Sequence, residues 1–291
     1  MRPGPWILGW LVLSGFCADI RGADAGASDV AKQDRSPSMD KVRWTEAKTS
    51  SDINAEYDFI AGPLNEHYTD IRYLFTRRTL LAFLIHGGVE WQRLGFDGRR
   101  TVVLPGQLES GNAYLALDFR WSTKDLIRIQ ARPGIFSDFE GVDSGDFNAP
   151  VDIAYTRIPS NRFQWAIGLS IDTWRKYRIL PGGGIRYQIN DRWKLQFMLP
   201  QPQVEYKARD DLHVFFGADL RGDTYRLAHN FGSSHGNQAL DNTLVDYSEI
   251  RIGPGFSWNI KPLLELNMQA GVLVQRQFYY HNDGITVNNS I

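Results

Sequence analysis

The side chains best suited to acid–base or metal chemistry are six histidines: His67, His86, His213, His229, His235 and His281. His229 and His235 flank Asn230–Ser234 in one polar stretch. Two histidines in one loop could supply two of the ligands of a metal site. No third ligand follows at the spacing of a zinc site. The sequence therefore predicts solvated loop histidines, and it indicates no metal and no cofactor.

A serine and a histidine that meet can act as nucleophile and base, and His86 and Ser170 are candidates for such a pair. Both lie on the polar side of segments in which apolar and polar residues alternate. Membrane-barrel hydrolases act at the lipid-facing surface, whereas this register turns both side chains to the interior. We therefore expect that the protein is not an enzyme, with a barrel enzyme acting on lipid as the alternative.

The glycine run Gly182–Gly184 could suggest a phosphate-binding loop. Such a loop presents its amides at the start of a helix, and no helical pattern follows here. Glycines at the start of a strand permit a bulge or a tight bend. We expect this run, like Pro133-Gly134, to shape the end of a strand.

The elements that must position these residues are strands. In RFQWAIGLSID (162–172), Phe163, Trp165, Ile167, Leu169 and Ile171 alternate with small or polar residues, which is the period of a strand with one apolar face. Eleven such runs follow one another from Thr79, and no helical periodicity of comparable length competes. They cover about 79–93, 112–121, 126–136, 150–158, 163–173, 179–189, 192–199, 203–209, 212–220, 244–258 and 263–281. The predicted fold class is all-β.

The connections between the runs differ in length along the chain. Tight connections of turn-forming residues alternate with mostly longer ones, such as 95–111, 137–149 and 221–243. Outer-membrane barrels have this arrangement, with short periplasmic turns and longer external loops. Asn282-Asp283-Gly284 predicts a further hairpin, and Ile285–Ile291 then begins a twelfth strand. The prediction is an up-and-down antiparallel transmembrane β-barrel of about 12 strands whose last strand is truncated.

The first 78 residues do not follow the strand pattern. Arg2, the apolar run Trp6–Ala18 and the pattern Ala23-Asp24-Ala25 predict a signal peptide at residues 1–25. Residues 26–78 are predicted to form an N-terminal arm, mostly flexible, with one possible short strand at 54–61. The barrel is assigned to residues 79–291, and export by the signal peptide places it in the outer membrane of the cell.

Composition excludes one class of partner. The 291 residues carry a formal net charge of −1, so no basic surface is available to neutralise phosphates and no nucleic acid is expected. The one cysteine, Cys17, lies within the predicted signal peptide, so the mature chain has no disulfide.

Three segments resemble a known family: ALDFRWSTKDLIRIQARPGIFSDFEG (116–141), ILPGGGIRYQINDRWKLQFMLPQPQVEY (179–206) and LVDYSEIRIGPGFSW (244–258). Their most specific parts are the Arg132–Phe139 element and the Leu180–Gly184 run. They are similar to a family of predicted outer-membrane β-barrel proteins, the domain of unknown function six-two-six-eight, over roughly 112–284. The resemblance implies an exported barrel and no particular activity.

The apolar face of each strand must meet either a protein core or lipid. A soluble β-sandwich that binds a ligand would place charge on the opposite face, whereas that face often carries glycine, alanine or serine, as at Ala166, Gly168 and Ser170. Aromatic residues also gather near strand ends, as in the interfacial girdles of membrane barrels. Lipid is the favoured environment, and the soluble sandwich is the alternative.

The predicted lumen face carries charges of both signs. The residues assigned to it are Asp118, Arg120, Arg128, Arg132, Asp152, Arg186, Lys194, Glu249, Arg251 and Glu265. An open, selective pore tends to carry charges of one sign, whereas mixed charges form ion pairs that fill a small barrel. The predicted function is a structural barrel or a porin-like narrow passive channel. Its predicted partners are outer-membrane lipid and small solutes.

Overall fold

The computed structural model describes residues 12–18, 20–21, 49–62, 64–80, 83–98, 103–261, 264–282 and 284–288. Within these ranges the chain is almost entirely β, with helical turns at α1 (Phe231–Ser234), η1 (Ser144–Asp146) and η2 (Gln238–Leu240). No helix in the described part is long and apolar enough to cross a membrane.

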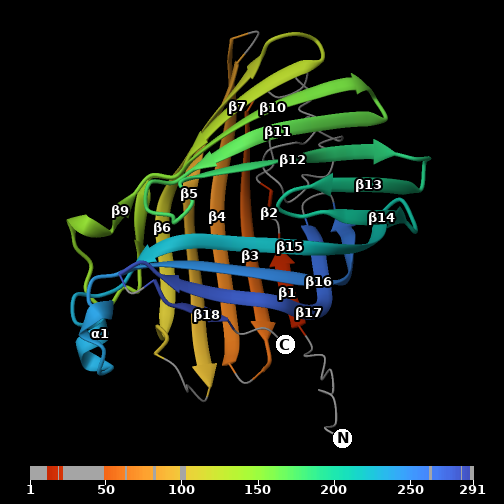
Figure 1. Ribbon diagram of the computed structural model, residues 1–291. Coiled ribbons are helices and arrows are strands. Elements are labelled where there is room, and N and C mark those ends of the chain that lie inside the picture. Colours follow the sequence, from red (N-terminus) through yellow and green to blue (C-terminus); the bar gives the residue numbers. More distant parts are fainter. Residues whose placement is uncertain are drawn as a thin grey trace, which may run out of the picture.

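The strands form one sheet that closes on itself (Figure 1). Its consecutive antiparallel neighbours are β3 (Thr49–Ile60), β4 (Leu64–Leu80), β5 (Phe83–Gly98), β6 (Gln107–Arg120), β7 (Asp125–Ala131), β10 (Val151–Ser160), β11 (Phe163–Ile171), β12 (Ile179–Gln188), β13 (Trp193–Met198), β14 (Gln203–Lys207), β15 (Leu212–Arg226), β16 (Leu244–Lys261) and β17 (Leu264–Tyr280). In Figure 1, β15, β16 and β17 cross in front of β3 to β6, as the two walls of a barrel do. The prediction of an all-β antiparallel barrel is confirmed.

The ring closes along one edge of β17. Two strands share that edge: β18 (Thr286–Asn288) lies opposite Gln277–Tyr279, and β1 (Val12–Ala18) lies opposite 266–271. β1 also pairs with β3, as does β2 (Ile20–Arg21). Both β1 and β2 fall within the predicted signal peptide, so cleavage after Ala25 would remove them from this edge. The signal peptide stays a prediction.

From residue 49 onward the predicted N-terminal arm is not flexible but forms strands, and the possible short strand at 54–61 corresponds to part of β3. β3 and β4 are full members of the ring and pair continuously with each other and with β5. The alternation in β4 is hard to detect because its inward residues include the apolar Tyr68 and Leu74, while its outward residues include the polar Thr69. Residues 22–48 lie outside the described part. All eleven predicted runs correspond to strands, namely β5 to β7 and β10 to β17.

The polarity of the barrel is inverted relative to a water-soluble protein. Large apolar side chains at alternate strand positions are exposed on the outer face, for example Val89 (60%), Ile167 (59%) and Phe216 (58%). Charged side chains at the intervening positions are buried, for example Asp118 and Arg276, each 0% exposed. The alternation thus turns its apolar register outward and its polar register into the lumen.

The two ends of the barrel differ. One end, here the turn end, carries the connections 121–124, 161–162, 189–192 and 208–211, whereas the loop end carries 132–150, 172–178 and 227–243. The loop 132–150 contains β8 (Gly134–Ser137), which pairs with β6, and β9 (Phe147–Asn148). The predicted alternation of short and long connections is therefore present, with 199–202 as a short member of the loop end.

A cluster of buried apolar side chains fills the lumen at the loop end. We call it the apolar plug, and it consists of Leu64, Tyr68, Leu94, Phe96, Leu104, Leu108, Phe136, Tyr225, Leu227, Ala228, Phe231, Leu240, Val245, Tyr247, Phe278 and Tyr280. Four of these residues, Leu227, Ala228, Phe231 and Leu240, come from the loop 227–243, which contributes its apolar side chains to the cluster. The loop end of the lumen is therefore packed, and the polar part of the lumen lies beneath it.

Candidate functional site: a charged chamber in the barrel

A chamber of about 590 Å³ lies inside the barrel. It borders the apolar plug through Tyr68, Leu94, Tyr225 and Tyr247. Its charged lining consists of the carboxylates of Glu56, Asp70, Glu90, Asp152, Asp219 and Asp223 and the guanidinium groups of Arg72, Arg132, Arg175 and Arg221. The volume lies within the range of about 300–1,000 Å³ that is usual for small-molecule sites.

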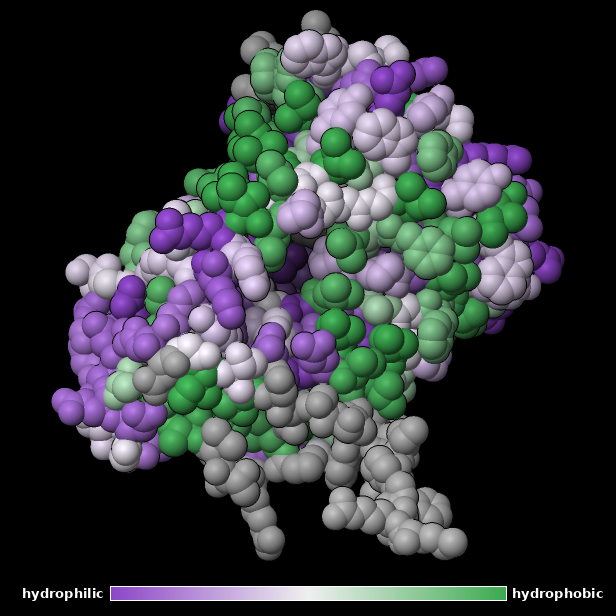
Figure 2. Space-filling model, viewed as in Figure 1, coloured by the Kyte–Doolittle hydropathy of each residue, from purple (hydrophilic) through white to green (hydrophobic). Residues whose placement is uncertain are grey.

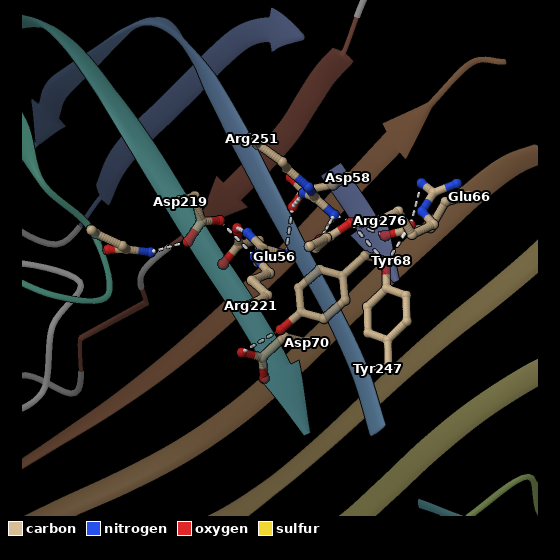
Figure 3. Close-up of polar contacts among 12 residues, drawn as sticks. Glu56, Asp58, Glu66, Tyr68, Asp70, Asp219, Arg221, Tyr247, Arg251 and Arg276 are labelled. Carbon is tan, nitrogen blue, oxygen red and sulfur yellow. Dashed lines mark hydrogen bonds and ion pairs between the residues drawn. The ribbon is translucent and has the colours of Figure 1, made fainter. Parts of the chain in front are cut away.

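A network of arginines and carboxylates lies beside the chamber (Figure 3). At its centre, Arg251 on β16 donates to Asp58 at 2.6 Å and to Glu66 at 2.8 Å, and it pairs with Glu249 at 2.5 Å. Arg276 on β17 pairs with Glu66 as well and donates to the Leu64 carbonyl oxygen. These charges are almost completely buried, so each depends on its partners in place of water.

The same network crosses the lumen. Arg221 on β15 pairs with Glu56 (2.6 Å) and Asp58 (2.8 Å) on β3, and with Asp219 (2.6 Å) on its own strand. β16, β17 and β1 separate β15 from β3 along the ring, so these contacts are not neighbour contacts within the sheet. The guanidinium also lies over the Tyr68 ring at 4.1 Å. Arg221 thus fixes the distance between two separated parts of the wall.

The remaining arginines of the chamber are also engaged. Arg72 pairs with Asp70 at 3.0 Å and with Glu90. Arg132 donates to both carboxylate oxygens of Asp223, at 2.9 and 3.2 Å. Arg175 lies 3.9 Å from Asp172 and donates to the Ser170 hydroxyl.

Two further polar layers lie toward the turn end. Asp118 accepts two hydrogen bonds of 2.5 Å from Arg128 and is 3.0 Å from His86, whose other ring nitrogen contacts Thr76 at 2.8 Å. Glu205 pairs with Lys194 at 2.8 Å and with His213 at 2.5 Å. The ion pairs therefore form successive layers along the lumen.

The ten residues predicted to line the lumen have different surroundings. Asp118 and Arg128 form a buried pair, Glu249 and Arg251 belong to the crossing network, and Lys194 pairs with Glu205. Arg132 and Asp152 line the chamber. Arg120 donates to the Ser122 carbonyl oxygen near the turn end, and Arg186 is half-buried on β12. The Glu265 side chain lies outside the described part.

Sequence reasoning missed the acids of β3 and β4. Glu56, Asp58, Glu66 and Asp70 supply most of the carboxylates that the network arginines bind. Their even spacing, two residues in β3 and four in β4, is the signal that could have placed them on one face of each strand. Arg276 on β17 was missed as well, and the structure shows that it is 0% exposed.

The barrel wall has an opening beside the chamber, between β12 and β15. The hairpin of β13 and β14 fills the wall only toward the turn end, because β13 pairs with β12 no further than Gly184 and β14 pairs with β15 no further than Gly217. The connection 199–202 then caps the hairpin, through bonds from Leu199 to Gly183 and from Leu220 to Pro200. Beyond these bonds, within the described residues, no strand bridges β12 to β15.

The chamber reaches the outside through this wall opening. Its lining includes Leu180–Gly183 of β12, Leu199 and Pro200, and Asp219–Asp223 of β15. Figure 2 shows a hollow between these strands, with hydrophilic residues at its floor and hydrophobic residues on the surface beside it. The loop 172–178 passes over the opening toward the loop end, where the Lys176 amide donates to Asp246 on β16.

Two loops at the loop end are tied together outside the strands. Asp143 accepts hydrogen bonds of 2.5 Å from the Gly145 amide and of 2.5 Å from His229, and these bonds lower the pKa of its carboxyl group. The Ala228 amide donates to Asp138 at 2.8 Å. Within 227–243, the hydroxyl and amide of Ser233 donate to Asp241 and lower its pKa.

The histidines do not gather into a metal site in the described part, where no group of three or more His, Cys, Asp or Glu side chains has suitable geometry. His86 and Ser170 do not meet, since the serine contacts Arg175. Ser234 and His235 are 3.0 Å apart at the loop end, but both also contact the Phe231 carbonyl oxygen, as residues that end a helix do.

These features define a closed antiparallel β-barrel with an apolar exterior and a charged lumen. The model of the family "Domain of unknown function (DUF6268)" matches residues 111–287, and the chain belongs to this family. One similar structure is the crystal structure of a Pseudomonas aeruginosa FadL homologue, with 7% identity, a TM-score of 0.33, and coverage of 91% of this chain and 86% of that one. No curated protein sequence matches the chain.

Proposed function

We propose that the protein is an outer-membrane β-barrel that forms a narrow passive channel for small solutes. The observation that carries the proposal is the inverted polarity: exposed apolar side chains outside and buried charges inside. Transfer of one large apolar side chain out of water is worth about 1.5–3 kcal/mol. Over the whole outer face the gain from a lipid environment is on the order of tens of kcal/mol.

The closed ring argues against a soluble sandwich. A sandwich buries its apolar residues between two facing sheets and exposes its charges. Here the sheet is continuous, and the space it encloses holds Asp118, Arg251 and Arg276. A bilayer suits this wall, because hydrocarbon meets the apolar outer face while the charges of the inner face pair within the lumen.

The packed lumen favours a narrow passage over a wide pore. The apolar plug fills the loop end, and ion pairs such as those of Arg221 cross the chamber beside it. A solute that enters the chamber meets charges of both signs, with carboxylates in excess of guanidinium groups, so a modest preference for cations is expected. We propose no enzymatic activity, since most charged side chains of the lumen are held in ion pairs with one another.

Insertion and conductance test the proposal directly. Refolded full-length protein is incorporated into phosphatidylcholine vesicles and then into a planar bilayer. We expect partition into the vesicle membrane and small, ohmic current steps. A protein that stays in solution without detergent contradicts the membrane barrel, whereas insertion without current contradicts the channel and supports a purely structural barrel.

A further inference from the structure

The wall opening lies where the membrane is expected to be. β13 spans six residues and β14 five, whereas β16 and β17 span 18 and 17. A strand needs about 9–11 residues to cross the hydrocarbon layer. The hairpin therefore covers only the half of the wall nearer the turn end, and the opening faces the leaflet at the loop end.

The rim of the opening suits an apolar chain. Leu180 and Leu199 are 40% and 46% exposed, and Leu220 and Pro181 lie beside them in the chamber lining. A Cβ added at Gly182 would meet no atom within 4 Å other than those of its chain neighbours, so the space directly beside this residue is open. An acyl or alkyl chain can therefore lie in the opening while its head is inside the chamber.

The charges of the chamber favour a cationic head. Its lining has six carboxylates and four guanidinium groups, and each guanidinium already has a carboxylate partner. Asp152 accepts a hydrogen bond of 3.5 Å from Gln130 and forms no ion pair with a described residue. Asp70 is largely buried, and its Oδ1 atom has no hydrogen-bond partner in the described part. Glu90 Oε2 likewise lacks a hydrogen-bond partner in the described part, as does Arg72 Nε, and the excess of carboxylates leaves the lining net negative.

We propose that the wall opening admits an amphiphile with a protonated amine head and an apolar chain from the adjoining leaflet into the chamber. The amine binds near Asp152 and Asp70, and the chain lies between Leu180 and Leu199. This inference rests on the proposed membrane barrel and names the class of compound that its chamber takes. Entry from the side also bypasses the apolar plug.

Photo-crosslinking tests this route. The probe is dodecylamine with a diazirine in its chain, added at about pH 7, where alkylamines are protonated, to the full-length protein in phosphatidylcholine nanodiscs. The comparison probe is dodecanoic acid with the same diazirine. We expect saturable labelling by the amine of peptides that contain Leu180 or Leu199, and little labelling of them by the acid.

Matched variants separate the opening from the charges. Gly182→Trp fills the passage and should abolish chamber labelling, whereas Gly111→Trp, also at a position open to a Cβ but outside the chamber lining, should leave it unchanged. Asp152→Asn and Asp70→Asn should each weaken amine binding by at least about tenfold. This is the loss of affinity expected when one hydrogen bond to a charged group is removed. Proteinase K resistance in the nanodisc checks that each variant is folded.

Each outcome decides the proposal. Equal labelling of wild type and Gly182→Trp overturns entry through the wall, and equal labelling by acid and amine, or no effect of either Asn variant, overturns the cationic head. Labelling needs no ion current, so a silent bilayer combined with specific labelling rejects the channel and keeps the binding site. Failure to enter nanodiscs rejects both.

Discussion

At the scale of single residues, the stability of the barrel depends on charged side chains that are buried away from water. Arg251 is 4% exposed and binds three carboxylates, from Asp58, Glu66 and Glu249. The carboxylates outnumber the arginines in this network, so each guanidinium compensates more than one negative charge. Loss of one arginine therefore leaves several buried carboxylates without compensation.

Arg251→Met should destabilise the barrel by about 3–5 kcal/mol, because it leaves buried charge unpaired. Urea unfolding in phosphatidylcholine vesicles measures the change. Arg209→Met is the control, since the Arg209–Asp211 pair is largely exposed at the turn end and should contribute at most about 1 kcal/mol. Equal effects of the two variants would contradict a structural role for the network.

At the scale of elements, the loop 227–243 holds the apolar plug in place. Phe231 is 2% exposed, lies within the plug and packs against His235 at a ring distance of 4.8 Å. The loop is joined to 132–150 by the bonds of Asp138 and Asp143, so the two loops are expected to move together.

Phe231→Ala should raise the single-channel conductance or the open probability, because it removes a large side chain from the plug and costs about 3–5 kcal/mol of local packing. Planar-bilayer recording measures the effect. Phe216→Ala, which removes an equal side chain from the lipid-facing surface, should leave the current unchanged. An unchanged current in Phe231→Ala would place the barrier to flow elsewhere in the lumen.

The loop should also respond to acid in a defined direction. The hydrogen bonds from Ser233 lower the pKa of Asp241 in the folded protein, so this stabilisation is complete above the ordinary carboxyl pKa of about 3.9 and is lost as the pH falls through the lowered value. We expect pepsin to cleave 227–243 only in the most acidic part of a pH series.

At neutral pH, Asp241→Asn should increase proteinase K cleavage of the same loop several-fold. Asp191→Asn, in an exposed turn at the opposite end, is the control. Cleavage that does not depend on Asp241 would mean that the loop is held by its apolar contacts alone.

The sequence predicted individual strands better than their lateral partners. Alternation placed β5 to β7 and β10 to β17 because one side of each strand is apolar and the other is not. It failed for β4, where Tyr68 faces inward into the apolar plug and Leu74 packs inward against Tyr114 and Ala116.

The candidate site was predictable only in part, for a related reason. Register alone gave the inward side of Asp118, Arg128 and Arg251, since a strand fixes which face a residue takes. It could not show that Arg221 meets Glu56 and Asp58, because strands distant along the ring carry these groups. The wall opening could not be predicted from the sequence either, since it depends on where the pairing of β13 with β12 and of β14 with β15 ends.

At the scale of the whole molecule, the environment of the outer wall decides the function. Ile167 is 59% exposed at the centre of β11, and its neighbours on the same face are Trp165 and Leu169. In water such a position tolerates a charge, whereas in hydrocarbon it does not.

Ile167→Arg should destabilise the protein in vesicles by about 2–4 kcal/mol, the cost of an arginine near the middle of a membrane barrel. Val142→Arg is the control, because Val142 is 50% exposed in the loop 132–150. Unfolding in phosphatidylcholine vesicles measures both. A near-zero effect at Ile167 would indicate that this face meets water.

The shortness of β13 and β14 has a consequence for the bilayer itself. Six residues at about 3.3 Å each, tilted by about 45°, rise only about 14 Å, roughly half the height of a usual apolar band. Hydrocarbon cannot satisfy the backbone groups left unpaired above the hairpin, so lipids there should thin and bring their polar groups toward the protein. One side of the barrel would then deform the membrane and gather short-chain lipids next to it.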